Sequence, residues 1–347
     1  MKLVTFRQSF ERASEARAGV LLPYGVVDLQ AALPLVFEDM QDTHLDMLRL
    51  LEGGDEGLGL DAANEIVNAV MEQIGGAVDV VQDDGDPDSV DLAGAMSIGG
   101  AELLLPRSAV KLLAPLPRPR SLRDFFAFEQ HVANTRPKGR AIPPFWYKQP
   151  VFYFGNHQAI IGPDQPLLLP HTEQLDYELE VACVIGREGR DIDPSEVWDY
   201  IAGFMIMNDF SARDLQKEEM SVGMGPAKGK DFATALGPML VTPDELEDYI
   251  TNDGTNFQLD MVARVNGRTY SQGNLDTMHY GWGQLIAQAS RDATLYPGDV
   301  IGSGTVGSGC ILELTPEAVG GWLEPDDIIE LEVTGLGILK NRIVYST

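Results

Sequence analysis

Apolar residues recur along the chain in two patterns, which predict helices in its first third and strands in the rest. Two stretches, from Leu33 to Leu51 and from Asp61 to Ile74, carry apolar residues at helical spacing, and each ends at a pair of glycines. Ahead of them, GVLLPYGVVDLQ places two apolar runs around the turn PYG, which is the pattern of a β-hairpin. The first third is therefore expected to form a small domain.

The rest of the chain is dominated by short apolar or alternating runs between Gly, Pro and Asn residues. These runs predict strands in FYFGN, AIIG, LEVACVIG, AGFMIMND, PMLVT, DMVARVNG, DVIGSGTV, CILEL and IIELEVTGLGILKN. The helices expected here run from Ser121 to about Thr135, from Ser211 to Met220 and from Trp282 to Arg291. Many strands with few helices favour an α+β, β-rich sandwich or roll over a doubly wound sheet.

A proline-rich segment, LLAPLPRPRSLRD, predicts a linker between two domains. We therefore divide the chain of 347 residues into a small N-terminal domain, residues 1–108, and a larger domain, residues 109–347.

The net charge narrows the classes of partner. At −28 the protein repels nucleic acid and anionic membranes, so neither is expected as a partner. An acidic solvated surface and a salt-loving source explain this charge equally well. No stretch approaches the roughly 20 apolar residues that span a bilayer, and the N-terminal residues lack the apolar run of a signal peptide, so a cytoplasmic protein is expected. Cys183 and Cys310 lie in apolar runs and are expected to be buried thiols.

Two glutamates stand two residues apart in the apolar run LDYELEVACVIG. On a strand this spacing puts the carboxylates of Glu178 and Glu180 on one face. Two carboxylates entering an apolar strand are costly unless a cation neutralises them, and oxygen ligands suit Mg²⁺, Mn²⁺ or Ca²⁺. The pair alone fits an edge strand with two solvated glutamates equally well.

A third carboxylate lies where a strand is expected to turn into a helix. AGFMIM runs into Asp209, and Ser211 with Asp214 three residues later forms a capping-box pattern. Asp209 is therefore expected at a strand-to-helix corner, where its carboxylate is free to bind a metal. Arg213 and Gln216 share one face of the expected helix, with Arg213 one turn past Asp209. A capped helix with an ordinary surface arginine gives the same pattern.

The segment SLRDFFAFEQHVANTR is expected to be a helix with a polar stripe. On a helix Asp124, Phe128 and His131 are spaced i, i+4 and i+7, so a carboxylate and an imidazole frame an aromatic ring. A histidine on an apolar face is more often a core residue than a catalyst. The stripe alone leaves both interpretations open.

Further polar residues interrupt glycine-rich or apolar segments in the second half of the chain. Lys230 lies in GPAKGKDF, Thr305 in GSGTVGSG, and Glu313 in the strand expected over CILEL. On that strand Glu313 points away from its leucine neighbours. The glycines around Thr305 suggest a phosphate-binding loop, but no Walker lysine or dinucleotide fingerprint follows them. A tight turn explains these glycines equally well.

Taken in order, these segments resemble the fumarylacetoacetate hydrolase family. The resemblance covers about residues 106–347 and rests on DYELE, NDFSARDLQ, KGKDF followed by LGP, PGDVIGSGTVG, ILEL and VTGLGILKN. The segment RAGVLLPYGVVDLQ resembles the small N-terminal domain of the family more weakly. The resemblance implies a mixed β-sandwich roll preceded by that small domain, and a homodimer.

The resemblance also implies roles for individual residues. A divalent cation, with Mg²⁺ preferred to Mn²⁺ or Ca²⁺, is expected to bind Glu178, Glu180 and Asp209, with Asp124 as the fourth ligand of the branch that has a longer N-terminal extension. His131, paired with Glu313, is similar to the general base of that branch. The substrate and oxyanion contacts that the resemblance implies are Arg140, Tyr153, Arg213, Gln216, Lys230 and Thr305.

Two positions depart from the family pattern. Phe126 and Met220 stand where the animal enzyme of the tyrosine pathway has tyrosines. We expect both to line the substrate pocket, and both lack a hydroxyl donor. The pocket is therefore expected to be less polar or differently shaped, which changes discrimination between substrates.

Together these features predict a metal-dependent hydrolase that cleaves a carbon–carbon bond in a 1,3-dicarbonyl acid of the fumarylacetoacetate or acylpyruvate type. The cation would act as a Lewis acid, and His131 with Glu313 would activate water. The side chains of Lys230, Arg213 and Gln216 would stabilise negative charge. Two alternatives stay open: a hydratase, dehydratase, decarboxylase or isomerase of 2-oxo acids that uses the same metal–enolate chemistry, and a non-catalytic metal-binding module.

Overall fold

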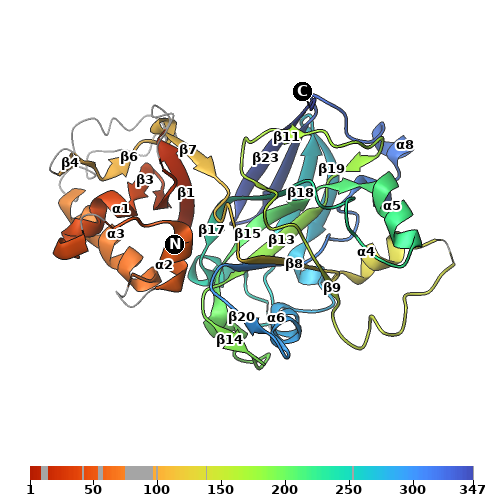
Figure 1. Ribbon diagram of the computed structural model, residues 1–347, viewed down its shortest axis with the longest axis horizontal. Coiled ribbons are helices and arrows are strands. Elements are labelled where there is room, and N and C mark those ends of the chain that lie inside the picture. Colours follow the sequence, from red (N-terminus) through yellow and green to blue (C-terminus); the bar gives the residue numbers. More distant parts are fainter. Residues whose placement is uncertain are drawn as a thin grey trace.

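A small lobe formed by the first third of the chain stands beside a larger, strand-rich body (Figure 1). This computed structural model describes residues 1–8, 15–40, 43–53, 58–74, 97–98, 101–137, 139–251 and 254–346. The fold is β-rich, with mixed sheets and short helices, so the expected α+β sandwich roll is confirmed. In the described residues no helix is both long and apolar enough to cross a membrane.

The larger sheet has 12 strands among the described residues and extends through both parts of the molecule. Its strands are β1 (Lys2–Gln8), β2 (Arg17–Leu22), β3 (Gly25–Asp28), β6 (Leu104–Leu105), β7 (Val110–Leu113), β8 (Ser121–Phe125), β9 (Phe152–Phe154), β10 (Ile160–Ile161), β13 (Leu179–Ile185), β15 (Ile201–Asp209), β17 (Thr234–Val241) and β21 (Asp299–Gly302). They follow the order β6-β3-β2-β1-β17-β15-β13-β21-β8-β9, with β7 paired to β1 and β10 to β17.

Strand β1 connects the lobe to the body. It pairs antiparallel with β17, with Lys2 opposite Val241 and Leu3 opposite Leu240. The hairpin expected around PYG is formed by β2 and β3. Because β7 follows residue 108 and pairs with β1, the strands on either side of the predicted boundary belong to one sheet. The division at 108 and 109 itself stays a prediction.

The body also contains a second sheet of five strands, which shares an apolar core with the larger sheet. It follows the order β11 (Leu167–Leu168), β23 (Gly337–Val344), β22 (Ile328–Val333), β18 (Asp260–Val265) and β19 (Arg268–Asn274). Three two-stranded ribbons complete the described strands: β4 (Ser97–Ile98) with β5 (Ala101–Glu102), β12 (Leu175–Asp176) with β16 (Ser211–Ala212), and β14 (Gly189–Arg190) with β20 (Thr294–Leu295).

Strand β13 lies at the centre of the body, and all seven of its residues are buried. Alternate side chains enter two different cores. Val181 and Cys183 pack in the core shared with the second sheet, whereas Ala182 and Val184 pack in the core shared with the lobe. Burial on both faces explains why this strand is a continuous apolar run in the sequence rather than an alternating one.

The helices are short. They are α1 (Leu29–Ala32), α2 (Met47–Glu52), α3 (Leu60–Ile74), α4 (Glu129–Asn134), α5 (Arg213–Ser221), α6 (Trp282–Ser290), α7 (Ile311–Leu314) and α8 (Pro316–Val319), with 3₁₀ turns at Leu33–Leu35, Glu38–Met40, Arg107–Ala109, Val197–Tyr200, Pro243–Tyr249 and Leu275–Thr277. The helices α3 and α6 confirm two predictions, and α5 confirms a third with a later start. The glycine pair expected to end α3 lies outside the described residues.

The single helix expected from Leu33 to Leu51 is wrong. The described residues there form two 3₁₀ turns, which follow directly after α1, and α2. Pro34 lies at the start of the first 3₁₀ turn, where it lacks an amide donor to continue α1. The helix α2 then begins after its N-cap residue Asp46, whose side chain accepts a hydrogen bond of 2.8 Å from the amide of Arg49. The apolar residues thus keep helical spacing across the two 3₁₀ turns and α2, although these elements do not form one continuous helix.

The helix expected from Ser121 to Thr135 is also wrong. Its first five residues form β8, which pairs in parallel with β21 and antiparallel with β9, and only Glu129–Asn134 is helical. The aromatic residues of FFAF favour a strand, and the ladder on both sides of β8 supplies its backbone hydrogen bonds. Asp124 is consequently on a strand, and His131 is on α4.

Two local predictions in the second half are corrected as well. The strand expected over CILEL is wrong, since four of its residues form the helix α7. An apolar run this short fits the periodicity of a helix and of a strand equally well. The capping box at Ser211 and Asp214 is absent: Ser211 lies in β16 and its hydroxyl donates to the carbonyl oxygen of Asp209. Asp214 instead accepts a hydrogen bond from Thr172. Both cysteines are buried, as expected.

Candidate active site

Four carboxylates lie at neighbouring strand ends of the larger sheet. Glu180 is on β13, with Glu178 immediately before that strand. Asp209 is the last residue of β15, and Asp124 is on β8. These strands are ordered β15-β13-β21-β8 in the sheet, so segments far apart in the chain bring their carboxylates to one place.

All of these strands present the carboxylates on the face that the lobe covers farther along. Ala182, two residues after Glu180, packs in the core shared with the lobe. Met207, two residues before Asp209, packs in the same core. The carboxylates therefore occupy the polar end of a face that is otherwise apolar.

Three of the four carboxylates form a tight group. Oxygen atoms of Asp124, Glu178 and Glu180 all lie within 4.8 Å of one another. The exposed fractions of these residues are 5%, 4% and 0%. Asp209 is linked to the group by Lys230, whose Nζ lies 2.6 Å from Asp209 Oδ2 and also contacts Glu178. The structure thus brings together the four metal ligands that the resemblance implies.

The electrostatics of the group differ from one carboxylate to the next. Burial and the negative charges of Asp209 and Glu178 raise the pKa of Asp124 well above its usual range, and burial with Asp124 does the same for the pKa of Glu180. Burial also opposes ionisation of Glu178, but the positive charges of Lys230 and Arg213 outweigh it and lower the pKa of Glu178. Asp124 and Glu180 therefore favour their protonated forms in the metal-free protein, whereas Glu178 is ionised.

This donor set fits a divalent cation. Glu180 Oε2 is buried and has no hydrogen-bond partner among the described residues. A buried carboxylate oxygen without a partner is costly, and a metal ion satisfies it directly. The ligands are all oxygen atoms, which is the chemistry that Mg²⁺, Mn²⁺ and Ca²⁺ prefer.

The raised pKa values predict that cation binding depends on pH. Asp124 and Glu180 have to lose protons that they hold in the metal-free protein, so cation affinity is expected to rise with pH above about 4, the ordinary pKa of a carboxyl group, and binding is expected to release protons. Titration calorimetry with Mn²⁺ in two buffers of different ionisation enthalpy measures both quantities. An affinity that is independent of pH would contradict the assignment of these two ligands.

Two cationic side chains, those of Arg213 and Lys230, lie next to Glu178, and the side-chain amide of Gln216 contacts Arg213. The guanidinium of Arg213 donates to Glu178 Oε1 at 2.8 Å and to Gln216 Oε1 at 3.0 Å. The second contact confirms that Arg213 and Gln216 share a face of α5. The carboxylate of Glu178 therefore lies between two fixed cations, Arg213 and Lys230, which also offer positive charge to an anionic substrate in an acidic protein.

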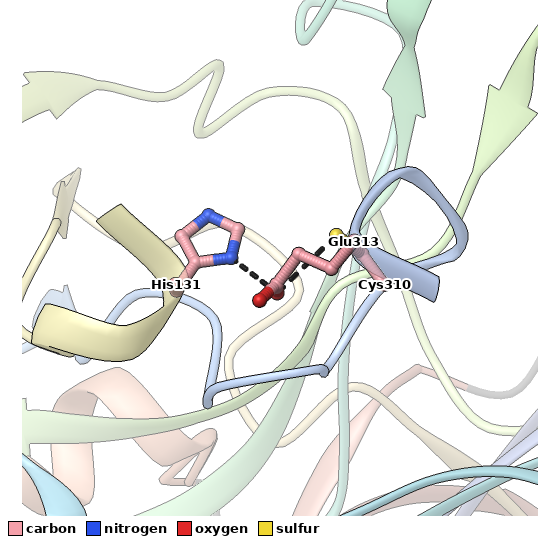
Figure 2. Close-up of side chains that lie close together, drawn as sticks. All are labelled: His131, Cys310 and Glu313. Atoms are coloured by element: carbon pink, nitrogen blue, oxygen red, sulfur yellow. Dashed lines mark hydrogen bonds and ion pairs between the residues drawn. The ribbon is translucent and has the colours of Figure 1, made fainter. Parts of the chain in front are cut away.

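His131 and Glu313 form a dyad (Figure 2). Nδ1 of His131 lies 2.5 Å from Glu313 Oε1, and their side chains are 5% and 0% exposed. The other oxygen of Glu313 accepts hydrogen bonds of 2.8 Å from Asn134 Nδ2 and from the amide of Ser308. Burial opposes ionisation of Glu313, but its bond with His131 and these donors lower its pKa. An ionised Glu313 accepts the Nδ1 proton, which leaves Nε2 of His131 as a proton acceptor.

Three further predicted residues border the site. Thr305 donates a hydrogen bond of 3.1 Å to Glu180 Oε1, and the hydroxyl of Tyr153 donates to Asp209. The ring of Phe126 meets the imidazole of His131 edge-on, with centroids 5.2 Å apart. These contacts place all three residues beside the carboxylates or the dyad.

Arg140 and Met220 are not joined to this group by any polar contact among the described residues. Both side chains are exposed, Met220 to 56%. Within the described ranges neither makes a hydrogen bond or ion pair with the carboxylates or the dyad. Their roles as substrate contacts rest on the resemblance alone.

One residue of the site was missed by the sequence analysis. Asp176 is fully buried and accepts a hydrogen bond of 2.8 Å from Nε of Arg213. It also accepts from the first amides of α7, those of Ile311 at 2.8 Å and Leu312 at 3.0 Å. Asp176 thus holds both the cationic side chain next to the carboxylates and the helix that carries Glu313. Its only sequence signal was an acidic residue at the start of the run DYELE.

Replacing Asp176 by asparagine is expected to destabilise the fold. Removing one partner of a buried ion pair costs about 3–5 kcal/mol, and the remaining bond from Arg213 to Glu178 keeps the loss toward the lower end. Denaturant unfolding measures the change, with Asp193→Asn, on an exposed turn, as the control. An unchanged free energy of unfolding would show that Asp176 does not hold the site together.

Comparison with known proteins identifies the family. The profile described as "Fumarylacetoacetate (FAA) hydrolase C-terminal" matches residues 121–344. The chain belongs to the fumarylacetoacetate hydrolase family. That match spans β8 to β23, and so contains every residue of the candidate site.

Relatives in this family have several activities. Human "Oxaloacetate tautomerase FAHD2A, mitochondrial" is 33% identical over 244 residues, which cover 70% of this chain and 72% of the relative. The solved fumarylacetoacetate hydrolase of Exiguobacterium antarcticum is 26% identical with a TM-score of 0.67, and the match covers 100% of both chains. The maleylpyruvate hydrolase of Sphingobium, solved with manganese(II) and pyruvate, shares the fold at 21% identity and a TM-score of 0.63, again over 100% of both chains. Members are thus enzymes, and they include hydrolases and a tautomerase.

Proposed function

We propose that this protein is a divalent-metal hydrolase that cleaves a carbon–carbon bond in a 1,3-dicarbonyl acid of the acylpyruvate or fumarylacetoacetate type. The observation that supports this most is the His131–Glu313 dyad, buried and joined at 2.5 Å, because His131 also lies near enough to Glu178 to help lower the pKa of that carboxyl. A hydrolase has to deprotonate water, and an imidazole whose Nδ1 is held by a carboxylate is suited to that task.

The carboxylates would bind the cation, and the cation would supply Lewis acidity. When bound by Asp124, Glu178, Glu180 and Asp209, it would polarise substrate oxygens and hold the dicarbonyl in place. Mg²⁺ is the ion we propose, and the manganese in the Sphingobium hydrolase supports a cation of this class.

The remaining steps belong to side chains of this chain. Nε2 of His131 takes a proton from water, and the hydroxide adds to the carbonyl carbon farther from the carboxylate. The bond between that carbon and the central carbon breaks, its electron pair forms an enolate, and a proton returns to that carbon, so an acylpyruvate gives a 2-oxo acid and fumarylacetoacetate a 3-oxo acid, each beside the released acid. Lys230 and Arg213, both held in place by the ionised carboxylate of Glu178, stabilise the negative charge that develops.

A tautomerase acting on oxaloacetate is the second candidate. The human relative with this activity in its name shares 33% identity over 72% of its length. Tautomerisation also needs a base beside a dicarbonyl acid, and the dyad can take a proton from carbon as well as from water. The two reactions differ in their products, because hydrolysis gives two fragments and tautomerisation leaves the carbon chain intact.

One experiment separates the two candidates. The purified protein, loaded in turn with Mg²⁺, Mn²⁺ and Ca²⁺, is given a panel of acylpyruvates, fumarylacetoacetate and oxaloacetate, and the products are followed by NMR. Two fragments from an acylpyruvate, with little effect on the oxaloacetate enol–keto equilibration rate, support hydrolysis. Faster oxaloacetate equilibration without cleavage of any panel member would replace the hydrolase proposal by the tautomerase.

Assembly and location complete the proposal. We expect a homodimer, as the family resemblance implies, and a small dicarbonyl acid as the ligand. The cytoplasmic location stays a prediction, and the name of the human relative carries the word mitochondrial.

A further inference from the structure

A thiol lies against the catalytic dyad. Cys310, the residue before α7, is fully buried, and its Sγ is 3.6 Å from Glu313 Oε1. The same oxygen is 2.5 Å from Nδ1 of His131. Figure 2 shows the carboxylate of Glu313 between the imidazole and the sulfur atom, with both directed toward it. One ligand atom from each residue lies within 4.8 Å of the other two.

The orientation of Glu313 is fixed by contacts outside this trio. Its Oε2 accepts from Asn134 and from the amide of Ser308, so Oε1 is held facing both His131 and Cys310. Because these donors belong to α4 and to the turn before α7, the trio is set by the fold and not by one flexible side chain. A preformed set of three converging ligands is what a metal site requires.

The chemistry of this trio differs from that of the four carboxylates. Sulfur, nitrogen and oxygen together are the ligands of Zn²⁺ and of related ions such as Cd²⁺, whereas Mg²⁺ and Ca²⁺ prefer oxygen alone. Three protein ligands leave one tetrahedral position for water. Zn–N and Zn–S bonds of about 2.1 and 2.3 Å place ligand atoms some 3.5 Å apart, so His131 and Glu313 have to separate by about 1 Å, while the 3.6 Å between Cys310 Sγ and Glu313 Oε1 already suits a shared ion.

We propose that His131, Cys310 and Glu313 form a second metal site, selective for Zn²⁺ and other ions that accept sulfur ligands, and that occupation of this site inactivates the enzyme. Binding at the site does not depend on which reaction the protein catalyses. Inactivation rests on the proposed role of the dyad, because an ion on Nδ1 and on Glu313 Oε1 replaces the hydrogen bond that orients the imidazole.

The charges of the bound state balance. The thiolate of Cys310 and the carboxylate of Glu313 contribute two negative charges against the two positive charges of the ion, so a neutral unit occupies a buried place. The thiol proton is released to solvent, and the imidazole keeps one proton by moving it from Nδ1 to Nε2. Zinc binding is therefore expected to release one proton and to strengthen as pH rises.

Cadmium gives a direct test of the sulfur ligand. Cd²⁺ is titrated into the metal-loaded protein in excess Mg²⁺, and the ultraviolet charge-transfer band of a cadmium–thiolate bond is recorded for wild type, Cys310→Ser and Cys310→Ala. Cys183→Ser is the matched control, because Cys183 is equally buried but lies on β13 away from the trio. The expected result is a saturable band of one thiolate per chain in wild type and in Cys183→Ser, and no band in either Cys310 variant.

Activity provides the second readout. With Mg²⁺ in excess, Zn²⁺ is expected to inhibit wild type and Cys183→Ser at the same concentration. In Cys310→Ser the concentration for half-inhibition is expected to rise by more than about 10-fold, the lower end of what losing even an outer-shell partner costs a zinc site. Activity without zinc should be kept in this variant, which also shows that it folds.

The outcomes are distinguishable. A band that persists in the Cys310 variants, or no band in wild type, overturns the second site whatever the enzyme turns out to catalyse. If the cadmium band depends on Cys310 but the protein with zinc bound is as active as the protein without zinc, the second site is supported and its inactivating effect is overturned. In His131→Ala the cadmium affinity should fall by more than about 10-fold, and an unchanged affinity would remove His131 from the ligand set.

Discussion

Glu180→Gln is expected to lose divalent-cation binding while keeping the fold. Glutamine has the same shape but lacks the charge of a carboxylate whose Oε2 finds no partner among the described residues. Removing a ligand should cost more than the roughly 100-fold in affinity that the most sensitive outer-shell changes cost, so activity at ordinary Mg²⁺ concentrations should disappear. Calorimetry with Mn²⁺ and an activity assay at rising Mg²⁺ measure both effects.

The same change is expected to leave the metal-free protein as stable as wild type or more stable. Burial and neighbouring carboxylates raise the pKa of Glu180, so wild type loses stability as pH rises above about 4, the unfolded value, and the neutral glutamine does not. Thermal unfolding of the metal-free proteins at several pH values tests this, with exposed Glu188→Gln as the control. Cation binding equal to that of wild type would show that Glu180 is not a ligand.

His131→Gln is expected to lose turnover while keeping the cation. A positioned general base contributes about 10²–10⁴-fold to the rate, and glutamine keeps a polar group near Glu313 without a basic nitrogen. The fall should appear in kcat, because the carboxylates and the cations that hold the substrate are unchanged. Exposed His171→Gln is the matched control.

The dyad also gives a test within one pair. Glu313→Gln should lower the rate less than His131→Gln, because the imidazole keeps its basic nitrogen and loses only the carboxylate that holds Nδ1. Wild-type rates in His131→Gln would remove His131 from the role of base. A normal rate in Glu313→Gln would leave His131 as a base without an orienting partner.

Much of the carboxylate group could be predicted from the sequence. Glu178 and Glu180 stand two apart in a run of apolar residues, and strand period alone put them on one face. Asp209 at the end of an apolar run was expected at the end of a strand, where it lies. The order of the strands in the sheet was not readable from spacing, yet it is this order that joins β15, β13 and β8.

Asp124 and His131 were placed in the site by an incorrect local structure. Helical spacing suggested one stripe, but Asp124 reaches the carboxylates from β8 and His131 reaches Glu313 from α4. An aromatic-rich run fits either period, and pairing with β21 and β9 decided in favour of a strand. Tertiary hydrogen bonding thus overrode a local pattern that pointed to the correct residues.

Asp176 and Cys310 could not be found from sequence spacing. Asp176 acts through the amides of α7, which is more than a hundred residues away and was expected to be a strand. Cys310 has its significance from Glu313 three residues later on a helical turn, where a strand would have pointed the two side chains to opposite faces. Because α7 was expected to be a strand, neither the contact of Asp176 with its amides nor the proximity of Cys310 to Glu313 could be predicted.

The pairing of β1 with β17 makes the lobe part of the architecture that the catalytic strands depend on. Ala182, Val184 and Met207 are shielded from water by residues of the lobe, on the same face that carries the metal ligands. A fragment cut at residue 109 would leave β17 with an unpaired end and these side chains exposed, which is the surface of an aggregating protein. For protein engineering, the lobe is thus required as an apolar cover for the strands that carry the active site. Any shortened version of this enzyme has to replace it with another apolar surface.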